Sequence, residues 1–173
     1  MKRILLLILT FLFLFNCTSF AEEHWQFVVS DTESDYFFDT QSIKYANLPD
    51  SMVINKSGIL VNVKRVYSTR RKDQLINALS ETMHSKKARF RMVSMDYAID
   101  EDMYNISHNC LKKFSVYYYD KNNEPVAHKQ YSKTIPTPIA ANSTEQKVFN
   151  TITAYAKDHD KEIMARSMEP EPL

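Results

Sequence analysis

The stretch from residue 112 to residue 131 constrains the fold more than any other part of the chain. It reads KKFSVYYYDKNNEPVAHKQY, and from Phe114 to Tyr118 every second residue is apolar or aromatic. That period of two, in residues that favour strands, is typical of a strand with one buried face and places Tyr118 in the core. Asn122 and Asn123 tolerate the positive φ of a turn, and Pro125 can open a returning strand. We therefore predict a β-hairpin.

Strands and a helix are also predicted before this hairpin. Trp25 to Val29 and Asp35 to Asp39 indicate a first hairpin, and Ile59 to Tyr67 indicates a third strand. From Arg71 to Ser85 the apolar residues recur every three or four positions, which predicts a crossover helix lying on the sheet. Residues 88–97 again alternate and are expected to form a fourth strand.

The rest of the chain completes an α+β fold. Residues 96–102 are expected to form an acidic turn and 104–109 a fifth strand. Ser143 with Gln146 has the spacing of a capping box, which predicts a C-terminal helix closing one face of the sheet. Residues 161–173 are expected to form a disordered charged tail. Consecutive strands with short connections favour an antiparallel sheet of about six to seven strands, with the C-terminal helix and the shorter crossover helix packed on it.

The N-terminus has the parts of a secretory signal peptide. A basic pair precedes an apolar run from Ile4 to Phe15, and Ser19 to Ala21 has the small-x-small pattern of a cleavage site. The apolar run is shorter than the ~20 residues of a membrane-spanning helix, and no later segment approaches that length. We predict that residues 1–21 are removed after Ala21 and that the protein is exported to the periplasm or the bacterial cell surface, without a transmembrane segment in the mature chain.

Two alternatives to this cleavage stay open. One is an uncleaved N-terminal anchor, and the other is a lipid attached to Cys17, which also follows an apolar stretch. The residues before Cys17 are Leu, Phe and Asn, without the small residue that a lipobox has at this place. Cleavage after Ala21 is therefore the leading prediction.

The mature chain is long enough for a single domain, and its net charge does not indicate a charged partner. Its 152 residues suffice for one domain, assigned to residues 22–160. Removing Lys2 and Arg3 leaves 20 basic and 21 acidic residues, so the net charge indicates no class of partner. The only glycine is Gly58, which excludes glycine-rich nucleotide loops, and nucleic acid is not an expected partner of an exported chain.

Several motifs of the mature chain occur together in one known family. They are the Trp25 strand, the SDYFFDTQSI stretch at 34–43, the valine-rich strand at 59–66, the Asn109–Cys110 step and the SVYYYD stretch at 115–120. In this combination the chain resembles the surface-adhesin protein E-like domain of bacterial envelope proteins, from about residue 25 to residue 157. The resemblance implies a small antiparallel sheet with a C-terminal helix packed on it. It also implies an exported protein whose named relative is an adhesin for host matrix and serum proteins.

The sequence contains no arrangement that indicates catalysis. On a strand Cys110 and His108 would share a face, where an imidazole can activate a thiol, but no orienting Asp or Asn is evident. The five histidines fit no metal-ligand spacing. We expect no catalytic residue, no metal and no cofactor. As the only cysteine of the mature chain, Cys110 has no internal disulfide partner, so an intermolecular disulfide in a homodimer stays open.

Two groups of residues are candidates for binding. Tyr117 and Tyr119 alternate with Tyr118 and are expected on an exposed aromatic strip, where tyrosine supplies rigid contact area. The other group is basic and suits an anionic glycan or an acidic protein. Its members are Arg70, Arg71, Lys72, Lys86 and Lys87. Because surface cations need no partner, a solvated helix rim is the alternative interpretation of this second group.

These observations favour an exported, non-enzymatic binding module, an adhesin for host proteins or anionic surface partners. The alternative is a structural or assembly protein of the envelope, which would act through strand pairing or through a dimer joined at Cys110.

The first prediction concerns export. We expect the intact mass of the protein, purified from the periplasmic fraction of its own cell, to correspond to a chain beginning at Glu22, because the cleavage pattern ends at Ala21. A mass for an acylated chain beginning at Cys17, in the outer-membrane fraction, would contradict this prediction. Full-length mass in a membrane fraction would also contradict it and would indicate an uncleaved anchor.

Overall fold

The computed structural model describes residues 24–48, 53–82, 85–132 and 134–169. The predicted signal peptide, with Ala21 and Cys17, and the last four residues of the predicted tail lie outside this part of the chain.

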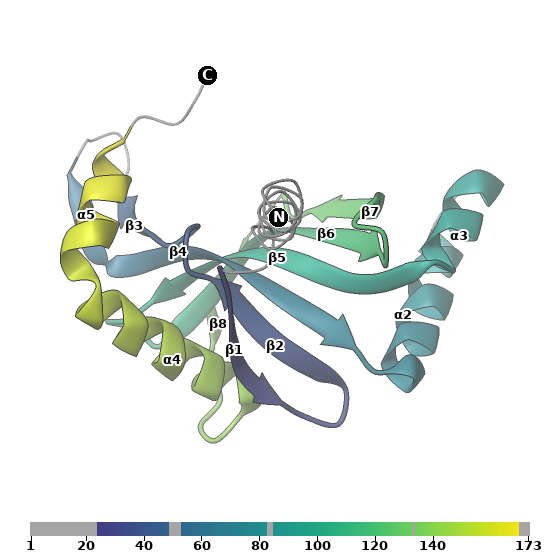
Figure 1. Cartoon of the computed structure of the whole chain (residues 1–173), viewed down its shortest axis with the longest axis horizontal. Helices are drawn as coiled ribbons and strands as arrows, with labels where there is room; N and C mark the ends of the chain where they lie inside the picture. The colour runs from purple at the N-terminus through teal and green to yellow at the C-terminus, as the bar shows by residue number, and fades with distance from the viewer. Residues whose placement is uncertain (1–23, 49–52, 83–84, 133, 170–173) are drawn as a thin grey trace, which may run out of the picture.

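A single antiparallel sheet organises the described residues (Figure 1). Six strands follow the order β1-β2-β4-β5-β6-β7, while β3 pairs with β4 and the two-residue β8 pairs with β6. The strands are β1 (Trp25–Ser30), β2 (Ser34–Asp39), β3 (Lys44–Asn47), β4 (Ile54–Tyr67), β5 (Met95–Asn105), β6 (Cys110–Asp120), β7 (Pro125–Gln130) and β8 (Thr137–Pro138). The predicted class, an antiparallel α+β fold, is confirmed.

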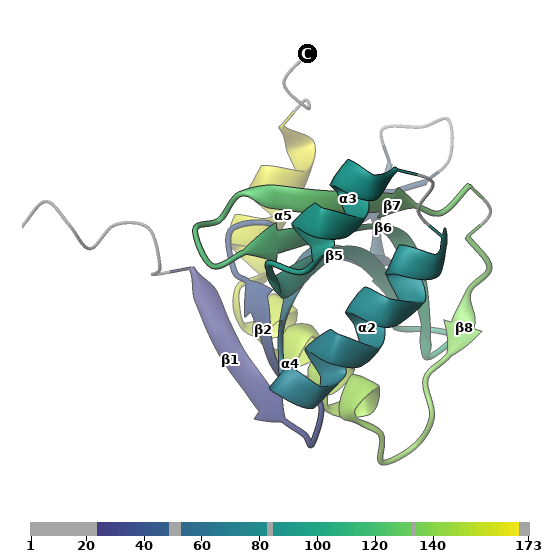
Figure 2. The ribbon, with the colours of Figure 1, turned by 90° about the vertical axis from the view of Figure 1, so that its right-hand side faces the viewer.

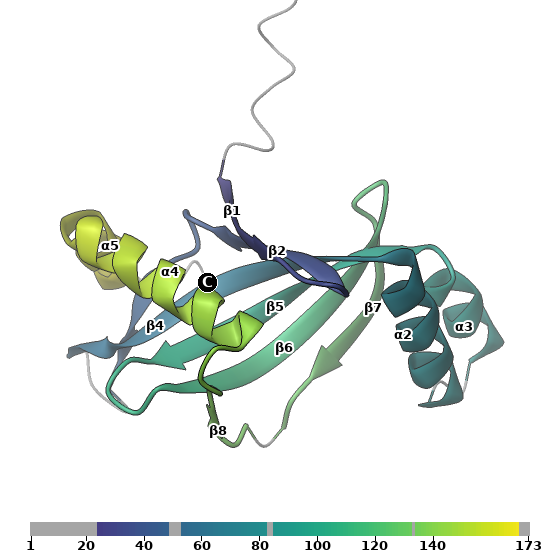
Figure 3. The same cartoon turned by 90° about the horizontal axis from the view of Figure 1, so that it is seen from below.

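Four described helices lie in two groups at opposite ends of the sheet. The helices are α2 (Thr69–Thr82), α3 (Lys86–Met92), α4 (Thr144–Asp158) and α5 (Asp160–Met168). In Figure 3, α4 and α5 lie on one side and α2 with α3 on the other, and β5 and β6 are visible between them. In Figure 2, α2 and α3 face the viewer and lie in front of the sheet. Among the described helices, none is long and apolar enough to cross a membrane.

The two groups of helices cover two separate hydrophobic clusters. In the first cluster Phe149 and Ile152 of α4 join Ile59 and Tyr104 of the sheet. In the second, Leu75 and Leu79 of α2 and Met92 of α3 join Ala98 and Tyr118. Since directly paired residues of an antiparallel sheet share a face, the register assigns Ile59, Tyr104, Ala98 and Tyr118 to one face. The described helices therefore pack on the same side of the sheet.

The central hairpin and the final helix form where the sequence predicts them. Asn123 has a φ of 64°, and β7 begins at Pro125. Tyr118 is buried, as the alternation predicts. The Ser143 side chain accepts a hydrogen bond from the Gln146 amide and caps α4, which confirms the start of the C-terminal helix.

The predicted strand at 88–97 is wrong, because its first part is helix α3 and a strand starts only at Met95. The alternation of this segment misleads, since the residue that it buries, Met92, packs against α2 from a helix. The acidic turn at 96–102 is also wrong, because these residues lie within β5. Asp100 and Asp102 are buried in this strand, and Asp100 is paired there with Arg65 from the neighbouring strand, a tertiary contact that no local pattern predicts.

The predicted strand at 104–109 has wrong bounds. β5 ends at Asn105, and a turn follows in which the Asn105 side chain accepts a hydrogen bond from the His108 amide and Asn109 has a φ of 45°. The short strand β3 was not predicted, since its four residues carry too little pattern to distinguish it from the bend before it.

The predicted disorder of the tail is wrong for residues 161–168, which belong to α5. Ile163 is fully buried in the first cluster. The Ser167 hydroxyl accepts a hydrogen bond of 2.7 Å from the Tyr45 amide, and Arg166 donates to the carbonyl oxygens of Thr40 and Ile43. A charged segment with a single core residue looks like a tail, but its polar side chains hold the β2–β3 connection and the start of β3.

The second prediction tests this anchoring of α5. We expect Ile163→Ala to lower the free energy of unfolding by about 2–5 kcal/mol, because it leaves a cavity in the first cluster. Met168→Ala, at a residue of the same helix that is 69% exposed, is the matched control and should change stability little. Urea unfolding followed by circular dichroism measures both variants. Equal stability of the Ile163→Ala variant and the wild type would show that α5 does not anchor the sheet.

Candidate functional site

A row of six side chains crosses the sheet on the face that the described helices leave open. Strand register pairs them one after another: Phe27, Phe37, Lys64, Ile99, Tyr117 and His128, one each from β1, β2, β4, β5, β6 and β7. We call these six residues the aromatic row. Because each is directly opposite the next, all six lie on one face. Neither hydrophobic cluster contains Tyr117 or Ile99, whereas both of their neighbours Tyr118 and Ala98 are in the second cluster.

The rings of this face contact one another. The Tyr117 ring stacks on the His128 imidazole with centroids 4.2 Å apart, and Tyr119 stacks on Tyr97 at 5.1 Å. The Lys64 ammonium lies 4.4 Å from the Tyr97 ring centroid. At the sheet edge Phe27 meets Phe37 edge-on at 5.5 Å and is 53% exposed. Such pairs restrict the side chains and make a preorganised surface.

The candidate tyrosines are therefore brought together on one face, but the candidate basic residues are not brought to them. The basic residues belong to α2 and α3, which pack on the face of Tyr118. Arg71 lies 3.4 Å from the Glu33 carboxylate, and Lys72 pairs with Asp96. Arg70 and Lys86 are exposed, and the side chain of Lys87 is outside the described part. The sheet separates the two candidate groups.

Cys110 and His108 do not form a catalytic pair in the described geometry. Cys110 is a free, half-buried cysteine at the start of β6, next to β8. His108 lies in the exposed turn before it, with Nδ1 3.1 Å from the Asn105 side-chain oxygen. In the described residues no group of three or more His, Cys, Asp or Glu side chains is arranged to hold a metal ion.

The structure also contains a buried charge cluster that the sequence analysis missed. Arg65 of β4 donates two hydrogen bonds, of 2.5 and 2.6 Å, to the two carboxylate oxygens of Asp100 in β5. The Lys113 ammonium lies 3.5 Å from the same carboxylate. Asp102, only 3% exposed, completes the cluster, and its Oδ1 has no hydrogen-bond partner among the described residues.

The surroundings of these groups change their protonation. Burial raises the pKa of Asp102 to about 7, with Lys113 opposing the shift and Asp100 adding to it. Burial alone would lower the pKa of Arg65, but the adjacent Asp100 carboxylate raises it above its ordinary value. Burial thus moves the pKa of Asp102 toward neutral pH.

A sequence signal for this cluster exists once β5 is recognised as a strand. Asp100 and Asp102 are two positions apart in this strand. Both therefore point to the side of Ala98 and Tyr104, which is the covered face. Acidic residues at inward positions require cations opposite them, and Arg65 and Lys113 occupy such positions on the neighbouring strands. The assignment of 96–102 to a turn concealed this signal.

Together these features define a one-sided antiparallel sheet with an open aromatic face and a charged, covered face. No protein-family model matches the chain, and no curated protein sequence does. Among solved structures, the chain is similar to protein E of Haemophilus influenzae, with a TM-score of 0.49 and 11% identity over 78% of this chain and 90% of that one. A further structure, of protein E from non-typeable Haemophilus influenzae, has the same TM-score at 11% identity and covers 86% of this chain and 90% of that one. This is a distant relationship of fold.

The third prediction follows from Asp102. A carboxyl with a pKa raised from 3.8 to about 7 on folding binds its proton more tightly in the native state, so stability falls as the pH rises from the unfolded pKa to the folded one. Asp102→Asn removes this loss. We expect the free energy of unfolding of the variant, measured relative to the wild type, to rise by on the order of 2–3 kcal/mol between pH ~5 and pH ~8.5.

Urea unfolding of both proteins across this pH range gives the measurement. Glu162→Gln, at an exposed acid of α5, is the matched control and should follow the wild type. A constant difference between Asp102→Asn and the wild type at all pH values would mean that Asp102 does not titrate in this range.

Proposed function

We propose that the chain is an exported, non-enzymatic binding protein, and that its partner is a protein that docks on the aromatic row. The observation that carries the proposal is the row itself. Each of six neighbouring strands of the sheet places a ring, an aliphatic chain or a lysine on the open face. Aromatic side chains are enriched at protein interfaces, where a flat apolar body with a polar tip suits a surface that must also be stable in water.

The dimensions of the row suit a protein partner. Neighbouring strands lie about 4.8 Å apart, so six strands span about 24 Å. One side of a standard protein interface covers about 800 Å², and a square patch of this area has a similar width. The stacked pairs Tyr117–His128 and Tyr97–Tyr119 reduce the ordering cost on binding, because their side chains are already held.

The charge of the aromatic row favours a protein over an anionic glycan. Lys64 is the only lysine or arginine of the row, and its ammonium lies over the rings of Tyr97 and Trp25. The candidate cations of α2 are on the other face, two of them beside carboxylates. A polyanion needs several free cations along its length, which the row does not supply.

The predicted signal peptide and the family resemblance extend this proposal to location and partner. Export would present the open face to the periplasm or the outside of the cell. The resemblance to the protein E-like adhesins suggests host matrix or serum proteins as partners, and these are the proteins to assay first.

The assembly role is the second candidate, and the edges of the sheet bear on it. β1 and β7 end the six-strand order and leave one side of each strand without a strand partner among the described residues. The register of β1 shifts between Phe27 and Val29, and β7 begins with Pro125. Bulges and prolines at an edge oppose the addition of a further strand. Docking on the face is therefore the better-supported mode.

The fourth prediction tests the row. We expect Phe27→Ala and Tyr117→Ala each to weaken binding to a matrix or serum protein about tenfold or more, because each removes a ring from the interface. Phe90→Ala, at an aromatic of α3 that is 83% exposed, is the matched control and should bind as the wild type does. Binding of the purified mature chain to an immobilised panel of matrix and serum proteins, with heparin as the polyanion, gives the affinities.

Two outcomes would contradict the proposal. Binding to heparin alone would move the site to the basic residues of α2 and α3. Equal losses in all three variants would show that the aromatic row is not the interface. Thermal unfolding of each variant identifies any loss that comes from misfolding.

A further inference from the structure

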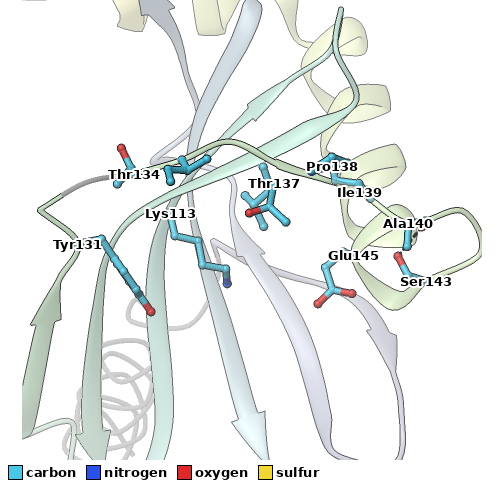
Figure 4. Close-up of a pocket in the computed structure, with 11 residues that line it drawn as sticks. Lys113, Tyr131, Thr134, Thr137, Pro138, Ile139, Ala140, Ser143 and Glu145 are labelled. Carbon is cyan, nitrogen blue, oxygen red and sulfur yellow. Dashed lines mark hydrogen bonds between the residues drawn. The ribbon is translucent and has the colours of Figure 1, made fainter.

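A pocket lies on the covered face, at a break in the pairing along the edge of β6. Strand β7 pairs with β6 at Ser115–Tyr119, and β8 pairs with it at Cys110 and Leu111. Between these two pairings, Tyr131 and residues 134–140 lie along a cavity of about 490 Å³ (Figure 4). A cavity of this size suits a small molecule or a few residues of a peptide.

The lining of the pocket combines apolar residues with hydroxyl groups and two opposite charges. Leu111, Ile135, Pro138 and Ile139 are among its apolar residues, and Thr134, Thr137 and Ser143 carry hydroxyls. Lys113 of β6 and Glu145 in the first turn of α4 also line it, and Figure 4 shows both side chains extending into the space between the strand and the helix. The pocket therefore suits a molecule with an apolar body and a charged end.

Behind the charged end, a smaller void reaches the unpartnered carboxylate. Leu111, Lys113 and Glu145 line both cavities, and Asp102 lines the smaller one. The Asp102 oxygen without a partner is buried there, which is costly unless a donor reaches it. The void has a volume of about 20 Å³, enough for one group of the size of a water molecule.

The charges around the void select the sign of that group. Arg65 and Asp100 neutralise each other through two hydrogen bonds. Of the remaining groups, Lys113 is positive while Asp102 and Glu145 are negative when ionised, which leaves one negative charge in excess. The tyrosine hydroxyls of Tyr36 and Tyr104 complete the titratable groups around the void.

We propose that this pocket binds a primary alkylammonium group, with the ammonium hydrogen-bonded to Asp102 and Glu145 and the alkyl chain on the apolar lining. A primary ammonium has the donors that Asp102 lacks and the size that the smaller void admits, whereas a quaternary ammonium has no donor and is too large. The chemistry is shared by a free amphipathic amine and by a lysine side chain of a peptide. The site is on the opposite face from the aromatic row and is independent of the proposed function.

The test is isothermal titration of the full mature chain with matched probes. Hexylammonium should bind saturably, and hexanoate and hexyltrimethylammonium should bind about tenfold more weakly or not at all. A short peptide containing one lysine, compared with the same peptide carrying acetyl-lysine, separates the two sources. If the lysine peptide binds more tightly than hexylammonium, the natural ligand is a protein segment, and the reverse order indicates a small amine.

Two variants connect the binding to the pocket. Asp102→Asn should weaken the binding of hexylammonium about tenfold. In the wild type, protonation of Asp102 should lower the affinity as the pH falls from about 8 to about 5, and the variant should not show this pH dependence. Thr137→Trp fills the pocket from an exposed position of β8 and should abolish binding even if Asp102→Asn folds poorly. Glu162→Gln is the matched control and should bind as the wild type does.

The proposal is overturned if hexanoate binds more tightly than hexylammonium, or if no probe binds. It is also overturned if Asp102→Asn and Thr137→Trp leave the affinity unchanged. Loss of binding to matrix or serum proteins in the variants of the aromatic row has no bearing on these outcomes, since those residues lie on the other face.

Discussion

The bidentate pair between Arg65 and Asp100 is the interaction on which the arrangement of the covered face depends. It joins the neighbouring strands β4 and β5 at the middle of the sheet, with the Asp100 side chain 1% exposed. Burying a charge is costly unless it is paired, so this position cannot be part of a continuous hydrophobic layer. The helices accordingly cover the sheet in two groups, one on each side of the charged centre.

This division of the covered face has a consequence for binding. A helix laid across the whole sheet would have to bury Lys113 completely, and the cost of desolvating its ammonium exceeds what a few apolar contacts return. Between the two groups of helices the fold instead leaves a pocket at the edge of β6, bordered by residues 134–140. The same charges that prevent a single core therefore supply the charged end of a cavity that also has apolar walls.

Local patterns predicted the parts of the fold that local interactions determine. The central hairpin needs only alternation, Asn123 and Pro125, and the start of α4 needs only Ser143 and Gln146. Helix α3, the long strand β5 and helix α5 depend on tertiary contacts. Met92 is buried by α2, Asp100 by Arg65, and Ile163 by the first cluster. In each case the local sequence alone favours another structure, and the partner that decides between them is distant in the chain.

The same distinction applies to the candidate site. Alternation assigns Tyr117 and Tyr119 to the face opposite Tyr118, because the parity of a strand is a local property. Which residues complete that face is a matter of strand order and register, so Phe27 and Phe37, eighty or more positions earlier in the chain, could be found only from the sheet. The basic residues of α2 and the two tyrosines were both expected at the surface, but a helix following β4 can lie on either face of the sheet. The contacts of Leu75 and Leu79 with the cluster of Tyr118 decide that question, and they leave the tyrosines with an aromatic rather than a cationic surrounding.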